Sequence, residues 1–261
     1  MSIFLPFSRT AVLFLAVSSG LCFAEDQKDL EPASASIEEI TIIGSVENAQ
    51  QIPGAAQFLS PERLGAFNHT DVQKVLREVP GVSLQIEDGF GLRPNISIRG
   101  VATERSSRIT LLEDNILIAP APYSAPSAYY FPTMGRMHAV EVIKGPAAIS
   151  QGPYTIGGAL NLVSTPIAQD PQLNFLAETG SDATHRARIA LHQNIGSRGK
   201  FMLESHLWRS DGFQAIRGSQ QDTGLTLDDY TGKFELGSKD GRHKLSLKLQ
   251  TTEQQSHPSY L

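Results

Sequence analysis

Side chains that could carry chemistry are scattered along this chain of 261 residues. The seven histidines form no HxxxH or HExxH cluster, so the sequence predicts no direct metal site. Adjacent carboxylates occur at residues 38–39 and 228–229 without a nucleophile or base beside them, and neighbours on a strand point to opposite faces. A GxSxG motif and a dinucleotide-binding fingerprint are missing. We therefore expect neither an enzyme nor a bound cofactor.

The glycine-rich segment at residues 152–157 has the spacing of a phosphate-binding loop. That motif depends on a lysine followed by Ser or Thr, and here Gly158 and Ala159 occupy those places. We interpret Gly157 and Gly158 as structural, because residues without a Cβ let two backbones approach closely. The net charge of -5 and the lack of a long basic block give no indication of nucleic-acid binding.

Short apolar elements separated by Gly and Pro turns must position any site that the chain has. Residues 70–79 predict an amphipathic helix, because apolar residues recur on one of its faces. This face consists of Val72, Val75, Leu76 and Val79. Strands are expected at residues 82–86, 95–99, 108–112, 116–118, 139–143 and 159–163. Between the third and fourth of these, Asn115 tolerates the positive φ that a tight hairpin turn requires.

From residue 173 onward, apolar and polar residues alternate with a period of two. One face of residues 183–192 carries Ala187, Ile189 and Leu191, and the other carries Arg186, Arg188 and His192. In the same way Leu245, Leu247 and Leu249 alternate with Ser246, Lys248 and Gln250. Such alternation is typical of a transmembrane β-barrel and also of a soluble sandwich. Tight turns at residues 196–200 and 237–242 and a longer loop at 210–226 fit the short and long connections of a barrel.

The first 24 residues have the features of a secretory signal peptide. Arg9 is their only charge, residues 11–17 are apolar, and residues 22–24 offer a cleavage site that would remove Cys22, the only cysteine. Residues 25–36 are polar, and they lead into the short β-prone segment IEEITII at residues 37–43. A segment of this kind can add as a strand to the sheet edge of a partner, because its backbone supplies the hydrogen bonds.

The run from residue 95 to residue 166 carries the strongest family signal. It contains, in order, NISIRGV, RITLLEDNILIAPAPY, VEVIKGPAAI and GPYTIGGALNLVSTP. These pieces resemble the plug domain of TonB-dependent outer-membrane receptors, and LLEDNILIAPAPYSAPSAYYFPT is most similar to ferric dicitrate-type receptors. The resemblance implies an α+β plug domain at residues 48–166, preceded by a periplasmic tail at residues 25–47. Residues 171–261 would be the first antiparallel β-strands of an incomplete transmembrane β-barrel, since this class has about 22 strands. We expect a fragment or truncated product of a longer receptor.

The resemblance also implies a function. Receptors of this family lie in the outer membrane of Gram-negative cells, in contact with its lipid, and import a ligand with energy delivered through TonB. The expected ligand is a ferric chelate, either a siderophore or ferric dicitrate, while haem, cobalamin or an oligosaccharide are alternatives within the class. A truncated, non-transporting periplasmic binding module is the alternative outside it. The segment at residues 37–43 would then be the TonB box, with TonB bound by Glu38, Glu39, Ile40, Thr41, Ile42 and Ile43.

Two further groups of site residues are implied by the plug resemblance. Apical loops of the plug, at residues 87–94, 119–131 and 151–155, would contact the ligand, and their aromatic and arginine side chains suit an anionic chelate. The candidates are Arg93, Tyr123, Tyr129, Gln151 and Tyr154. Packing within their own loop is the alternative role for the tyrosines. The second group, which would contact barrel carboxylates because a plug sits in a polar lumen, is Arg99, Arg105 and Arg108.

Overall fold

A computed structural model describes residues 42–118, 125, 127, 130–214, 223–239 and 242–256. The predicted signal peptide and most of the predicted TonB box, up to and including Thr41, therefore lie outside the described residues. The ligand candidates Tyr123 and Tyr129 also lie outside them.

Three short helices are each capped by a polar side chain. Helices α1 (Val46–Gln51), α2 (Pro61–Phe67) and α3 (Val72–Leu76) follow Ser45, Ser60 and Asp71. The side-chain oxygen of each capping residue accepts a bond from a backbone N–H of the first turn, a group that the helix itself leaves unpaired. Helix α1 spans residue 48, at which the plug domain is predicted to begin.

The region predicted to be a plug, which we call the plug below, is built on a five-stranded sheet whose strand order is β1-β6-β7-β4-β5. Its strands are β1 (Ala55–Leu59), β4 (Ile109–Glu113), β5 (Ile116–Leu117), β6 (Met137–Lys144) and β7 (Gly158–Ser164). Only β4 and β7 run parallel to each other in this described sheet. A separate antiparallel pair is formed by β2 (Val82–Gln85) and β3 (Asn95–Ile98). The strands expected from the sequence are therefore confirmed, with boundaries shifted by one or two residues.

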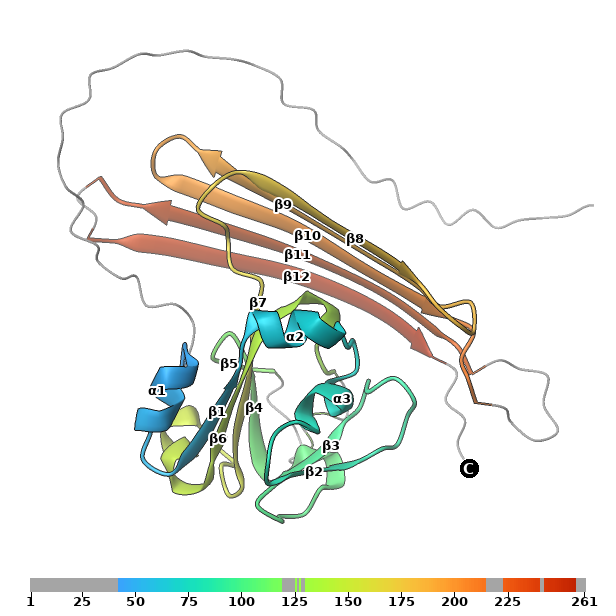
Figure 1. Cartoon of the computed structure of the whole chain (residues 1–261). Helices are drawn as coiled ribbons and strands as arrows, with labels where there is room; N and C mark the ends of the chain where they lie inside the picture. The colour runs from blue at the N-terminus through green and yellow to red at the C-terminus, as the bar shows by residue number, and fades with distance from the viewer. Residues whose placement is uncertain are drawn as a thin grey trace, which may run out of the picture. The chain divides into compact units, whose positions relative to one another are not determined.

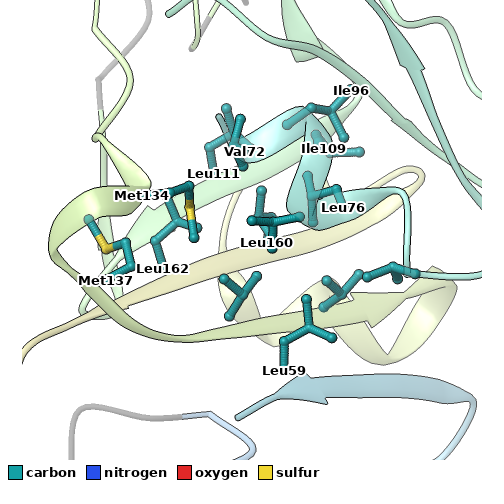
Figure 2. Close-up of a cluster of buried hydrophobic side chains, with 14 of the residues drawn as sticks. Leu59, Val72, Leu76, Ile96, Ile109, Leu111, Met134, Met137, Leu160 and Leu162 are labelled. Atoms are coloured by element: carbon teal, nitrogen blue, oxygen red, sulfur yellow. The ribbon is translucent and has the colours of Figure 1, made fainter. Parts of the chain in front are cut away.

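Helix α3 packs its apolar face into the main core, as the sequence predicts. Val72 and Leu76 of α3 are both 1% exposed and cluster with Ile109 and Leu160 of the sheet (Figure 2). A helix of five residues has no independent stability, so this burial must hold it in place. Each such side chain contributes about 1.5–3 kcal/mol when it is fully buried.

Two local predictions about backbone geometry are confirmed. The β4–β5 turn places Asp114 and Asn115 at φ of 50° and 63°, the left-handed pair that a two-residue hairpin turn needs. At the start of β7, a Cβ on Gly157 would lie 2.8 Å from the carbonyl oxygen of Ile98, and one on Gly158 would overlap that of Ile143. The absence of a Cβ at these two glycines is therefore what allows the backbones to approach closely.

The second sheet is an antiparallel meander in which neighbours in the chain are neighbours in space (Figure 1). Its strands are β8 (Gln172–Thr179), β9 (His185–Ile195), β10 (Gly199–Ser210), β11 (Leu225–Gly237) and β12 (Lys244–Ser256). The connections at residues 196–198 and 238–243 are short, and the one at residues 211–224 is longer, as predicted. No helix in the described ranges has both the length and the apolarity needed to cross a membrane.

The meander has two chemically different faces. On β10, the side chains of Met202, Glu204 and His206 are buried, whereas the intervening Leu203 is 55% exposed. We call the buried side the plug-facing face, because its polar groups bond to plug residues, and the other side the outer face. The outer face includes the exposed apolar side chains of Phe175, Ile189, Leu203, Tyr230, Leu245, Leu247 and Leu249. The predicted alternation is confirmed.

Candidate functional site

A buried cluster of charged groups joins the plug to the meander. Arg136, which ends a short 3-10 turn before β6, is completely buried. Its Nη1 and Nη2 donate to the two carboxylate oxygens of Glu113 at 2.6 and 2.9 Å. Its Nε donates to Oδ2 of Asp229 on β11 at 3.1 Å, and Nη2 also donates to the Tyr130 hydroxyl. One guanidinium thus holds a plug carboxylate bidentately and a strand carboxylate from the side, which is a strong geometry for arginine.

Two strand lysines complete the cluster, which consists of Arg136, Glu113, Asp114, Asp229, Lys233 and Lys248. Lys248 of β12 donates to Oε1 of Glu113 and, at 2.6 Å, to Oδ2 of Asp114. Lys233 of β11 donates to the carbonyl oxygen of Thr165 at 2.8 Å and lies 3.6 Å from Asp114. Three cations therefore face three carboxylates, so the buried charges are paired, as burial requires.

The cluster shifts the pKa of its plug members. Desolvation alone would raise the pKa of Glu113, but the hydrogen bonds and charge of Arg136, followed by Lys248, hold it below its ordinary value. Desolvation acts on Asp114 in the same way, and Lys233 and Lys248 bring its pKa below the ordinary value. Burial opposes the charge of Arg136, but its bonds to Glu113 outweigh it and raise the arginine pKa. All three groups are therefore ionised at neutral pH.

The predicted ligand loop at residues 87–94 is organised by one carboxylate. Asp88 accepts backbone N–H bonds from Phe90 and Leu92 through Oδ1 and from Arg93 through Oδ2, at 2.8, 3.1 and 3.0 Å. A turn held in this way has its shape fixed by its own side chain. Arg93, the principal ligand candidate, is exposed on it.

The same loop is anchored on the plug-facing face of the meander. The ring of Phe90 meets Trp208 of β10 edge-on at 5.5 Å, and Leu92 joins Trp208, Leu225 and Leu227 in a small core. Edge-on aromatic pairs stabilise such a contact beyond the area that they bury. The anchor leaves Arg93 on a rigid base, which is the arrangement expected of a binding residue on a loop.

The remaining described ligand candidates lie elsewhere on the plug. Gln151 is half-buried at the end of the 3-10 helix Gly145–Gln151, and Tyr154, at φ of 66°, has a side chain that is 43% exposed. Thr110 of β4 fixes this segment through the carbonyl oxygen of Pro153. These residues and Arg93 therefore have different surroundings, and their joint contact with one ligand stays a prediction.

The three arginines predicted to contact a barrel have other neighbours. Arg105 forms an ion pair with Glu87 inside the plug and lowers the pKa of that glutamate. Arg99 and Arg108 are exposed, and the guanidinium of Arg99 lies over Gly145. Among the described residues, arginine pairing between plug and strand carboxylates is made at Arg136 instead. Contacts of Arg99, Arg105 and Arg108 with a barrel stay predictions.

The tail that leads into α1 is bound by a buried carboxylate. Glu141 of β6 is 0% exposed and accepts hydrogen bonds from the backbone N–H groups of Ile42, Ile43 and Gly44. Ile43 itself is 3% exposed. The two described residues of the predicted TonB box are therefore fixed on the plug.

Sequence reasoning misses the charges that hold this architecture together. The alternation of β12 places Lys248 correctly on the polar face, opposite Leu247 and Leu249, but it cannot name the partner of that lysine. Glu113 and Asp114 are interpretable from the sequence as hairpin residues only. The only signal in the sequence is that this acidic pair interrupts an otherwise apolar hairpin. That signal does not identify the lysines and the arginine that pair with it.

Comparison with known proteins connects this architecture to a family. The family model described as TonB-dependent Receptor Plug Domain matches residues 48–159. Residues 48–159 therefore resemble the plug domain of TonB-dependent receptors. They are followed by an antiparallel sheet that resembles the start of the barrel of such receptors. Among the described residues this sheet does not close on itself.

Individual proteins that this chain resembles share a fold and differ in the ligand that their names give. The vitamin B12 transporter BtuB of Photobacterium profundum is 22% identical over 231 residues, which is 87% of this chain and 37% of that protein. The unliganded ferric citrate transporter FecA has a TM-score of 0.69 at 23% identity, over 83% of this chain and 33% of FecA. The ferric yersiniabactin uptake receptor FyuA of Yersinia pestis has a TM-score of 0.67 at 19% identity, over 79% and 32% of the two chains. The chain thus spans about a third of the length of these relatives.

Proposed function

We propose that this chain acts as part of a TonB-dependent outer-membrane receptor that imports a ferric chelate, a siderophore or ferric dicitrate. The observation that carries this proposal is the plug domain joined by buried ion pairs to one face of a strand meander. The outer face of the meander carries many exposed apolar side chains. A plug held in a polar lumen and strands turned toward lipid are what such a gate requires.

Each part of the chain has a role in this proposal. Residues 1–24 direct export, and the TonB box at residues 37–43 offers its backbone to TonB, through Glu38, Glu39, Ile40, Thr41, Ile42 and Ile43. The plug blocks the pore, and its apical loops hold the ligand with Arg93, Tyr123, Tyr129, Gln151 and Tyr154. Ligand binding must favour the state in which the tail is free, since otherwise it could not signal across the membrane.

Uptake assays with several ligands test this proposal. Cells that depend on the gene encoding this chain are supplied with radiolabelled ferric dicitrate, a ferric siderophore or cyanocobalamin, with and without a functional TonB. We expect uptake of a ferric chelate that requires TonB. Uptake of cyanocobalamin alone would show that the ligand is a cobalamin and not a ferric chelate. The absence of any TonB-dependent uptake would contradict the proposal.

Replacing Arg93 by alanine is expected to weaken chelate binding, because the exposed guanidinium would no longer pair with the anionic ligand. One such charged contact corresponds to about a tenfold change in dissociation constant. Equilibrium binding of the radiolabelled chelate to outer membranes measures this dissociation constant. The control is Arg77→Ala, which removes another exposed arginine of the plug. Equal affinities of the Arg93 variant and the unmodified receptor would show that Arg93 does not contact the ligand.

A further inference from the structure

The carboxylate of Glu141 binds three consecutive backbone N–H groups of the tail. Its Oε1 accepts from Ile43 and Gly44, and its Oε2 accepts from Ile42, each at 2.8 Å. The carboxylate lies in the middle of β6, about a hundred residues away along the chain, and is 0% exposed. Hydrogen bonds to an ionised acceptor away from water are among the strongest that a backbone can make.

Asn161 of the neighbouring strand β7 orients this carboxylate. Its Nδ2 donates to Oε2 of Glu141 at 2.8 Å, and its Oδ1 accepts the backbone N–H of Asn115 at 3.0 Å. Asn115 directly follows Asp114, which pairs with Lys248 of β12. Polar contacts, together with the peptide bond between Asp114 and Asn115, therefore connect the meander through Asn161 to Glu141 and the tail.

Glu141 occupies the groups that strand addition would need. A segment that adds to the sheet edge of a partner does so through its backbone N–H and C=O groups. Ile42 and Ile43 belong to the predicted TonB box, and both of their N–H groups are already donated to Glu141. The two interactions cannot use the same hydrogen atoms at once, so they exclude each other at these residues.

We propose that Glu141, positioned by Asn161, is a latch that holds residues 42–44 on the plug and keeps the end of the TonB box from pairing with TonB. The proposal rests on the proposed function and adds the residue that controls when the tail is available. Opening the latch exposes the N–H groups of Ile42 and Ile43 together. Since a partner binds only the open fraction, the closed latch lowers the apparent affinity for TonB by that fraction.

The substitution Glu141→Gln tests the latch with almost no change in side-chain volume. An amide offers one oxygen and one NH2 group. One of the two carboxylate oxygens is therefore replaced by a hydrogen-bond donor, which would face the N–H groups that the carboxylate now accepts. We expect the amides of residues 42–44 to exchange hydrogen for deuterium at least about tenfold faster. We also expect purified TonB periplasmic domain to bind the chelate-free receptor at least about tenfold more tightly.

Glu47→Gln is the matched control, because it makes the same substitution on the exposed side of α1, about one helical turn from the latch, and leaves the bonds of Glu141 intact. A second variant, Asn161→Leu, removes one donor to Glu141 and should give a smaller change in the same direction, about threefold. It also serves as the test if the Glu141 variant does not fold.

Two results would overturn the latch. Unchanged exchange of residues 42–44 in Glu141→Gln would show that the carboxylate does not hold the tail. Faster exchange with unchanged affinity for TonB would show that holding the tail does not control capture. Failure of the proposed function has a different signature, which is chelate uptake that continues in cells lacking TonB.

Discussion

Replacing Arg136 by methionine is expected to lower the free energy of unfolding by about 3–5 kcal/mol. The substitution roughly preserves side-chain volume but removes the guanidinium that bridges Glu113 and Asp229. Asp229 is 1% exposed, so its carboxylate would stay buried after losing its cation. Breaking one side of a buried ion cluster costs much more than a surface pair, because the remaining charge cannot return to water.

The pH dependence of this loss identifies its electrostatic cause. The pKa of Glu113 is below its ordinary value in the folded protein, so its stabilising contribution is present above the unfolded pKa. That contribution is lost as the pH falls through the folded pKa. Without Arg136, desolvation would push the folded pKa upward, and protonation would relieve the buried charge. The difference between the two proteins should therefore shrink below about pH 4.

Fluorescence of Trp208 measures this prediction during denaturation with guanidinium, because it is the only tryptophan and lies 6% exposed where the plug meets β10. Arg77→Met is the control for loss of an exposed plug arginine. Arg136→Lys keeps the charge without the bidentate geometry. Its loss of unfolding free energy should lie between that of Arg136→Met and that of the control. A loss below about 1 kcal/mol for Arg136→Met, the value of a surface ion pair, would contradict a structural role for the cluster.

The parts of the fold that can be predicted from the sequence are those whose signal is local. The apolar face of α3 is visible because Val72 and Leu76 recur at helical spacing, and the β4–β5 turn because Asn115 can adopt a positive φ. Polarity alternation likewise separates the two faces of β12. In each case the information lies within a few residues of the feature that it specifies.

The parts that cannot be predicted depend on pairs of residues far apart in the sequence. Glu141 is a single carboxylate in an apolar strand, and its partners at residues 42–44 lie nearly a hundred positions earlier. A buried glutamate usually has a partner, but a strand pattern cannot say where that partner is. The same holds for Arg136, because the sequence directs attention to Arg99, Arg105 and Arg108 instead. Short-range signals select the elements, and the long-range polar contacts then fix how those elements are joined.

Replacing Ile40 by proline is expected to reduce chelate uptake to the level of cells that lack TonB. A proline removes a backbone donor and fixes φ, so an extended segment that must pair with the sheet edge of a partner loses part of its ladder. Chelate binding should be unchanged, because the residues proposed to contact the ligand lie on the plug. Uptake and equilibrium binding of the same radiolabelled chelate, measured in the same cells, separate these two steps.

The same variant also separates energy transfer by TonB from the holding of the tail by Glu141. Ile40 precedes the three residues that donate to Glu141, so the amides at residues 42–44 should keep their slow hydrogen exchange in Ile40→Pro. Ile40→Val is the control, since it retains the N–H group and the β-branched side chain. Normal uptake by the proline variant would show that residues 37–43 are not where TonB binds. Faster exchange at residues 42–44 in Ile40→Pro would contradict this separation, because it would show that the substitution also opens the latch.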